Sequence, residues 1–178
     1  MPRYKFETLN QVHELTFSVN QRVPLFVDQQ CGSIFLQVLD AARNSLGFKL
    51  HAYVVMPEHV HLLVHLQQNV TVSQFLQRVK QPSATRILRT LRDKQDPILQ
   101  RLKSNYSQGP VPLRLWLPGG GYDRCVTKPE TMHQMVDYIH DNPVRRGLVA
   151  SPELYALSSA SIYAGVGDGP IAVDFPAV

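Results

Sequence analysis

The chain has 178 residues, of which 44% are hydrophobic and 18% charged, an ordinary globular balance in one domain with its own core. No apolar run approaches the length of a membrane span, and the first residues lack the apolar core of a signal peptide. Cys31 and Cys125 lie far apart, which favours free thiols over a disulfide framework or a zinc knuckle. We therefore expect a cytoplasmic protein.

The positive charge is concentrated in the middle of the chain. The net charge is +4, and residues 72–147 carry thirteen Lys or Arg against six Asp or Glu. The remaining residues carry five Lys or Arg against eight Asp or Glu. A basic middle segment indicates a polyanionic partner, nucleic acid first, although charge alone would equally fit a solvated helix face.

The first half of the chain reads as strand, helix, strand, strand. Residues 13–19 alternate apolar and polar side chains, which predicts a strand. Asp28 can cap a helix that ends at Gly47. Residues 50–55 and 59–65 are short runs rich in β-branched and aromatic residues on either side of Pro57, and they predict two strands with a tight connection.

The second half predicts helix, strand, helix. Thr71 or Ser73 can cap a long helix, which we expect Pro82 to kink or divide. Residues 96–117 give no clear assignment. A strand is expected at 122–127, and the capping-box spacing of Thr127 and Glu130 opens a helix that runs to about Asn142, stopped by Pro143. The Gly- and Pro-rich end of the chain predicts a loose tail.

The order β-α-β-β-α-β-α predicts an α+β fold with an antiparallel sheet and helices on one face, the ferredoxin-like or RRM-like arrangement. An RNA-binding RRM would carry aromatic stacking residues on its strands. Here histidines occupy such a surface, which points to a different chemistry.

Two histidines share one face of the strand at 59–65. Because strand side chains alternate, His59 and His61 point the same way while Val60, Leu62 and Val64 point into a core. Two imidazoles at this spacing can converge on one divalent metal ion. A single strand histidine is more often a satisfied surface or core residue, so the pair needs support from a second element.

The helix after residue 128 offers that support. Met132, Met135, Val136 and Ile139 form its apolar stripe, and Tyr138 and Asn142 lie beside each other on one flank. A tyrosine oxygen can attack a phosphodiester, a metal can polarise the phosphate, and Lys and Arg can hold the strand. The alternative for Tyr138 is an ordinary boundary residue of an amphipathic helix.

Three segments resemble the single-tyrosine transposases of the HUH nucleases, and in particular their REP-associated branch. Residues 53–63, YVVMPEHVHLL, look like the His-hydrophobe-His strand of that family. Residues 137–149, DYIHDNPVRRGLV, look like its nucleophile helix, and residues 119–124, GGGYDR, are similar to the segment before that helix. The likeness covers about residues 10–160.

The resemblance implies that Tyr138 attacks single-stranded DNA and becomes a 5′-phosphotyrosine. It implies His59 and His61 as ligands of Mg²⁺ or Mn²⁺, and Asn142, one turn beyond the tyrosine, as the third ligand. It further implies hairpin-forming DNA as the partner and a catalytic domain over residues 1–163 with a tail at 164–178. Relatives of this fold either act as monomers or exchange the tyrosine helix in a dimer, and of these two states we expect the monomer. The cations expected at DNA are Arg78, Lys80, Arg86, Arg89, Arg124, Arg145 and Arg146.

Two other functions stay open. A domesticated relative would keep the fold and the basic surface and bind DNA hairpins without cutting them. A nucleotide hydrolase would use His59, His61 and His65, although this spacing is uneven for such a centre. We predict that Glu58 is a turn residue rather than a general base, and that His140 has a structural or DNA-contacting role.

Overall fold

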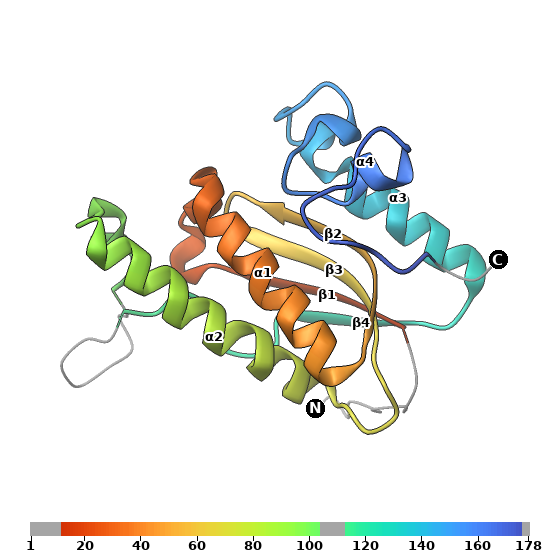
Figure 1. The fold of residues 1–178 in the computed structure, drawn as a ribbon, viewed down its shortest axis with the longest axis horizontal. Helices are drawn as coiled ribbons and strands as arrows, with labels where there is room; N and C mark the ends of the chain where they lie inside the picture. The colour runs from red at the N-terminus through yellow and green to blue at the C-terminus, as the bar shows by residue number, and fades with distance from the viewer. Residues whose placement is uncertain (1–11, 104–112, 176–178) are drawn as a thin grey trace, which may run out of the picture.

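The computed structural model describes residues 12–103 and 113–175, and it confirms the α+β class (Figure 1). One antiparallel sheet has the strand order β2-β3-β1-β4. Its strands are β1 (Val12–Ser18), β2 (Lys49–Met56), β3 (His59–His65) and β4 (Tyr122–Val126). The helices are α1 (Gln29–Leu46), α2 (Val72–Asp93), α3 (Pro129–Arg145) and the short α4 (Ala160–Tyr163). Within the described ranges, no helix is both long and apolar enough to cross a membrane.

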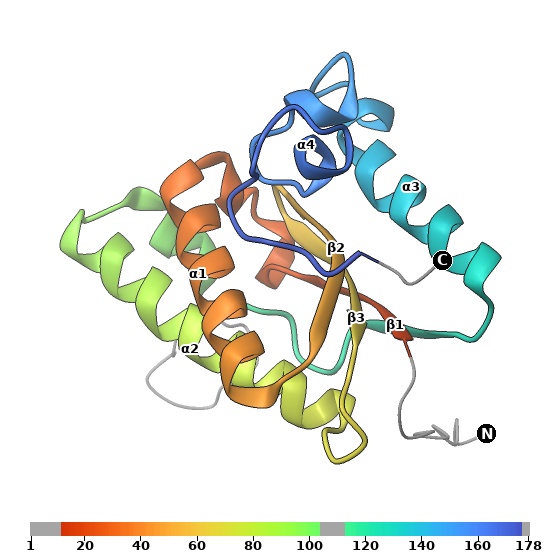
Figure 2. The same cartoon turned by 45° about the vertical axis from the view of Figure 1, so that its right-hand side comes forward.

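The two faces of the sheet carry different helices (Figures 1 and 2). α1 and α2 lie side by side on one face, as predicted, over the larger apolar core. α3 is an addition on the opposite face, where it packs chiefly against β2. Strand alternation explains the division, because Val60, Leu62 and Val64 of β3 join the larger core while Leu63 joins the smaller one under α3.

Three helix ends form as the sequence predicts. The Asp28 carboxylate accepts a hydrogen bond from the backbone N–H of Gln30 and caps α1, which ends at Gly47 in a left-handed conformation with φ of 67°. Thr71 begins α2 in a capping box with Gln74. These local signals fix where the two helices over the larger core begin.

Predictions based on proline and on Thr127 were wrong. α2 is not divided at Pro82 but continues as one helix, because Pro82 is exposed and water can satisfy the carbonyl that loses its N–H partner. A kink at Pro82, the other outcome expected there, stays a prediction. α3 likewise continues through Pro143 to Arg145, since a proline so close to the end removes a single helical hydrogen bond. Lys128, not Thr127, is the N-cap of α3, and no side chain caps it.

The end of the chain is held to the outer edge of β2. Ser158 pairs with Val54 in an antiparallel bridge, and further along Asp174 exchanges two hydrogen bonds with Leu50, at 2.7 and 2.9 Å. Arg43 of α1 forms an ion pair with Asp174 at 2.8 Å. The segment up to residue 175 is therefore not the loose tail that was predicted, although a domain boundary at residue 163 stays a prediction.

The segment that gave no sequence assignment returns to the larger core. It begins with a 3-10 helix, Pro97–Leu102, capped by Asp96; residues 104–112 lie outside the described part of the chain. Trp116 then pairs with Val19 in an antiparallel bridge, and the centroid of its ring lies 4.9 Å from the centroid of the Phe17 ring. Trp116 thus closes the core beside the end of β1.

Candidate active site

Two imidazoles meet on the α3 face of β3. The rings of His59 and His61 are nearly perpendicular, with centroids 4.8 Å apart, and their Nε2 atoms are 3.0 Å apart. Both side chains are buried. The structure thus brings together the two histidines that the strand pattern placed on one face.

Each ring is oriented through its other nitrogen. Thr16, the partner of His61 in the β1–β3 register, has its hydroxyl 2.8 Å from His61 Nδ1. The Glu58 carboxylate lies 3.2 Å from His59 Nδ1 and accepts a hydrogen bond of 2.8 Å from Arg146. Glu58 does lie in the turn before β3, as predicted, but its carboxylate is buried and binds two neighbours. Metal-binding histidines are commonly held by such outer partners.

Burial favours the neutral imidazoles. It lowers the pKa of His61 to about 4, and the nearby His59 acts in the same direction. Burial also lowers the pKa of His59, against the opposing charge of Glu58. Burial works to raise the pKa of the Glu58 carboxyl, but the hydrogen bond from Arg146 and the charge of His59 lower it below its usual value. Near pH 7 the two rings therefore offer lone pairs, while Glu58 is ionised.

Tyr138 of α3 stands beside this pair. Its ring is perpendicular to that of His61, with centroids 5.9 Å apart, and the Arg145 guanidinium lies 5.5 Å from the tyrosine ring. The side chain is 37% exposed, unlike the apolar residues Val136 and Ile139 on the buried stripe of the same helix. The phenol is therefore accessible from solvent while its ring contacts the histidine site.

An open pocket of about 490 Å³ joins these groups. Its walls come from β1, β3, β4 and α3, so a substrate there would touch both His61 and Tyr138. Burial raises the pKa of the Glu14 carboxyl, with the Arg124 charge opposing, so Glu14 is more easily protonated than an exposed glutamate. The lining residues are Glu14, Thr16, His61, Tyr122, Arg124, Met135 and Tyr138.

The imidazole pair fits a divalent ion. An ion with two metal–nitrogen bonds of about 2.1 Å at about 90° holds those nitrogens about 3.0 Å apart. In the described ranges no group of three or more His, Cys, Asp or Glu side chains is arranged for a metal. A third protein ligand would have to be of another type. The Asn142 Nδ2 donates to the Tyr138 carbonyl at 2.7 Å, which leaves Oδ1 as its possible donor atom to a metal.

The other histidines do not join this site. His65 lies at the far end of β3 with its ring 6.2 Å from that of His51, so a centre of His59, His61 and His65 does not form. His140 is buried, and its Nε2 lies 2.8 Å from the Ser159 hydroxyl. Of the two roles predicted for His140, its surroundings favour the structural one.

The predicted DNA-contacting cations fall into two groups. The first group lies at the active site: Arg124 lines the pocket, Arg145 lies over the Tyr138 ring and Arg146 binds Glu58. Arg78, Arg86 and Arg89 lie on the exposed side of α2, where Arg86 donates to the Gln37 amide oxygen at 2.8 Å. Lys80 is turned inward, and its ammonium donates to the carbonyls of Leu117 and Gly119 at 3.1 and 2.9 Å.

Gly121 brings the chain close to β1 just before β4 begins. Its φ is +75°, which favours glycine. A Cβ at this position would overlap the Thr16 carbonyl oxygen and crowd Phe17. The chain can therefore enter β4 along this path only without a side chain at residue 121.

Sequence reasoning missed Thr16 and Glu14 as residues of the site. A signal was present, because both are polar positions of the alternating strand β1 and therefore share a face. What the sequence could not give was the β1–β3 register that sets Thr16 opposite His61.

The sheet is RRM-like, and it carries a histidine pair with a tyrosine beside it. These features define a class of protein, and comparisons with known proteins identify the family. The family model of the IS200-like transposases matches residues 8–109, more than half of the chain. The chain belongs to this family of DNA transposases. No curated protein matches it in sequence.

A solved structure shares the fold. A REP-associated tyrosine transposase bound to a REP hairpin superposes with a TM-score of 0.68 at 18% identity, over 100% of this chain and 95% of that one. A "putative transposase" from Deinococcus radiodurans R1 gives a TM-score of 0.48 at 22% identity, over 79% of this chain and 97% of that one. This chain therefore shares the fold of the first of these structures.

Proposed function

We propose that the protein is a metal-dependent endonuclease and strand transferase of single-stranded DNA, with Tyr138 as its nucleophile. The observation that carries the proposal is the position of the accessible Tyr138 ring, 5.9 Å from the ring of His61 and on the same pocket. Within a transposase family, a phenol beside a neutral imidazole pair suits covalent cleavage of a phosphodiester.

The proposed step exchanges one phosphodiester for another. The Tyr138 oxygen attacks the phosphorus and loses its proton to solvent, and the bond from phosphorus to the 3′-oxygen breaks. The 3′-oxygen takes up a proton and leaves as a hydroxyl, while the 5′-phosphate stays on Tyr138. Attack by a 3′-hydroxyl on the phosphotyrosine reverses the exchange and rejoins DNA without an energy source.

The remaining residues of the site would hold the metal and the DNA and orient the two imidazoles. His59 and His61, through Nε2, and Asn142, through Oδ1, would bind Mg²⁺ or Mn²⁺, which supplies positive charge to the phosphate when bound. Thr16 and Glu58 fix the two rings. Arg124 and Arg145, at the pocket and against the Tyr138 ring, would contact DNA phosphates, together with the cations on α2.

Hairpin-forming DNA is the proposed substrate, and one chain is the proposed unit. The structural neighbour is bound to a REP hairpin, and this chain shares its fold over its full length. Tyr138 lies beside His61 of the same chain, so no second copy is needed to bring the phenol to the imidazoles. A monomer therefore suffices for the site.

Covalent capture tests the proposal. The native protein, mixed with Mn²⁺ and a hairpin oligonucleotide carrying single-stranded ends, should form an adduct that survives denaturing electrophoresis. Tyr138→Phe should lose it. Tyr122→Phe, which alters the other tyrosine of the same pocket, should keep it. An adduct that persists in Tyr138→Phe would show that another residue is the nucleophile.

A hairpin-binding protein that does not cut is the second candidate. It is favoured by the exposed arginines Arg78, Arg86 and Arg89 of α2, which can hold DNA without any metal or nucleophile. This candidate predicts salt-dependent hairpin binding with no adduct from the native protein at any Mn²⁺ concentration.

A further inference from the structure

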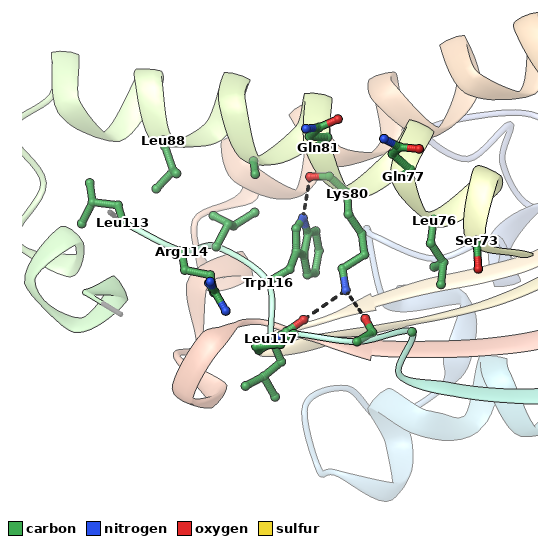
Figure 3. Close-up of a pocket in the computed structure, with 15 residues that line it drawn as sticks. Ser73, Leu76, Gln77, Lys80, Gln81, Leu88, Leu113, Arg114, Trp116 and Leu117 are labelled. Atoms are coloured by element: carbon green, nitrogen blue, oxygen red, sulfur yellow. Dashed lines mark hydrogen bonds between the residues drawn. The ribbon is translucent and has the colours of Figure 1, made fainter. Parts of the chain in front are cut away.

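A second pocket lies on the opposite face of the sheet from Tyr138. It is a groove of about 470 Å³ between α2 and the extended segment 113–120, and Figure 3 shows both walls. Its lining is mostly apolar, with several leucines from both walls. We name it the α2 groove. The lining residues that matter below are Gln77, Lys80, Gln81, Ala84, Arg114 and Gly120.

Hydrogen bonds hold the two walls together. The Trp116 indole N–H lies within hydrogen-bond distance of the Lys80 carbonyl and the Ser83 hydroxyl, at 3.0 and 3.1 Å. Lys80 reaches the opposite wall through its ammonium and binds the carbonyls of Leu117 and Gly119 (Figure 3). Lys80 is thus a structural part of the groove.

The groove carries amide and cationic side chains beside an apolar floor. Gln77 and Gln81, one helical turn apart, lie exposed on α2, and Arg114 lies on the facing segment. Two cations, Lys80 and Arg114, and no carboxylate are found among its described lining residues. An apolar surface lined with amide and guanidinium groups suits nucleobases, because Gln and Arg pair with base edges.

The α2 groove is continuous in the chain with the catalytic pocket. Gly120 lines the groove, and Tyr122, two residues later, lines the pocket with Tyr138. The short segment between them passes the end of β1, where Gly121 leaves no side chain in the way. A DNA strand that leaves the pocket past Gly121 would therefore run toward the groove.

We propose that the α2 groove binds unpaired nucleotides of the DNA strand whose phosphate lies at Tyr138, with Gln77, Gln81 and Arg114 reading the base edges. The nature of the ligand rests on the proposed function, whereas the groove itself does not. Cations along α2 add attraction for the strand, and the absence of carboxylates among the described lining residues removes repulsion.

Binding without cleavage tests the inference. Fluorescence anisotropy in EDTA would compare a blunt DNA hairpin with the same hairpin carrying a six-nucleotide extension, 5′ in one probe and 3′ in another. One extension should tighten binding to the native protein. Gln81→Ala should weaken that extended probe roughly tenfold, the value of a good base contact, and leave the blunt hairpin unchanged. Ala84→Phe, which fills the groove, should do the same.

Gln29→Ala, an exposed glutamine at the start of α1, is the matched control and should bind all probes as the native protein does. The inference is overturned if neither extension tightens native binding, or if both groove variants bind the extended probe as the native protein does. Failure of the native protein to form the Tyr138 adduct would instead count against the proposed function. Because Gln81 is exposed, its variant gives an answer even if Ala84→Phe fails to fold.

Discussion

The two faces of the sheet are built from the same strands but serve different ends. Under α1 and α2, aromatic rings from β1, α1 and Trp116 pack edge to face, and the core is closed. On the other face α3 packs chiefly on β2, which leaves an open pocket over β1, β3 and β4. One face thus specifies the fold, and the other is left free to carry polar groups at fixed positions.

This contrast explains why buried histidines are tolerated. Each imidazole is desolvated, yet each has a hydrogen-bond partner, Thr16 on β1 for His61 and Glu58 in the preceding turn for His59. The core on the opposite face packs around Val60, Leu62 and Val64 and so holds the β3 backbone between the histidines. We therefore expect stability and activity to be separable residue by residue along β3.

Substitutions at two neighbouring residues of β3 should separate the two faces of the sheet most clearly. Leu62→Ala opens a cavity in the closed core and should lower the free energy of unfolding by about 2–5 kcal/mol. His61→Ala should change it by no more than about 1 kcal/mol, because the pocket admits water, and should reduce adduct formation at least about 100-fold. Urea unfolding and covalent capture measure the two effects. Equal stability losses would mean that the faces are not distinct.

We expect Glu58 to position His59 for the metal, and we expect its loss to have a smaller effect. Glu58→Gln removes the charge that orients His59 and holds Arg146, so Mn²⁺ should bind about 10–100-fold more weakly. Calorimetric titration of Mn²⁺ without DNA measures this directly. Glu153→Gln, on the 3-10 helix Pro152–Leu154, removes a carboxylate that contacts neither histidine and is the control. Unchanged affinity in Glu58→Gln would leave the carboxylate with a purely structural role.

The smallest expected effect is a loss of stability at low pH. It concerns a histidine on the α3 face of the sheet, away from the pocket. His51 is buried, its Nδ1 lies 2.6 Å from the Asp174 carbonyl, and its Nε2 has no partner among the described residues. Burial lowers its pKa. The unfolded chain therefore takes up this proton first, so the free energy of unfolding should fall as the pH drops below about 6.5.

Urea unfolding at pH 7.5 and pH 5 measures this loss. His51→Gln keeps an N–H donor for Asp174 but has no proton to gain, so it should lose less stability between the two pH values. Each unit by which the pKa is lowered corresponds to about 1.4 kcal/mol. The same acid loss in the variant as in the native protein would mean that other buried histidines carry the whole effect.

The sequence was sufficient where a signal was local. Alternation placed His59 and His61 on one face, helical spacing placed Tyr138 on an exposed flank, and Asp28 and Thr71 marked helix starts. It failed where the outcome depends on tertiary surroundings. Neither Pro82 nor Pro143 ends a helix, because packing along the rest of each helix outweighs one lost hydrogen bond.

Contacts between distant elements were also beyond reach. Arg146 meets Glu58 across 88 positions of the chain, and Lys80 meets the carbonyl of Leu117 across 37. No periodicity in a single segment records such pairs, because they depend on how α3 and α2 dock. Lys80 shows the consequence, since its charge predicted a DNA contact and its geometry gives a wall of the α2 groove.

The close passage of Gly121 over Thr16 has an effect on an imidazole that it never touches. Any side chain there would push the β1 backbone away, and the Thr16 hydroxyl would carry its hydrogen bond with His61 out of line. Gly121, which has no side chain, thus determines the orientation of the His61 imidazole through the Thr16 hydroxyl.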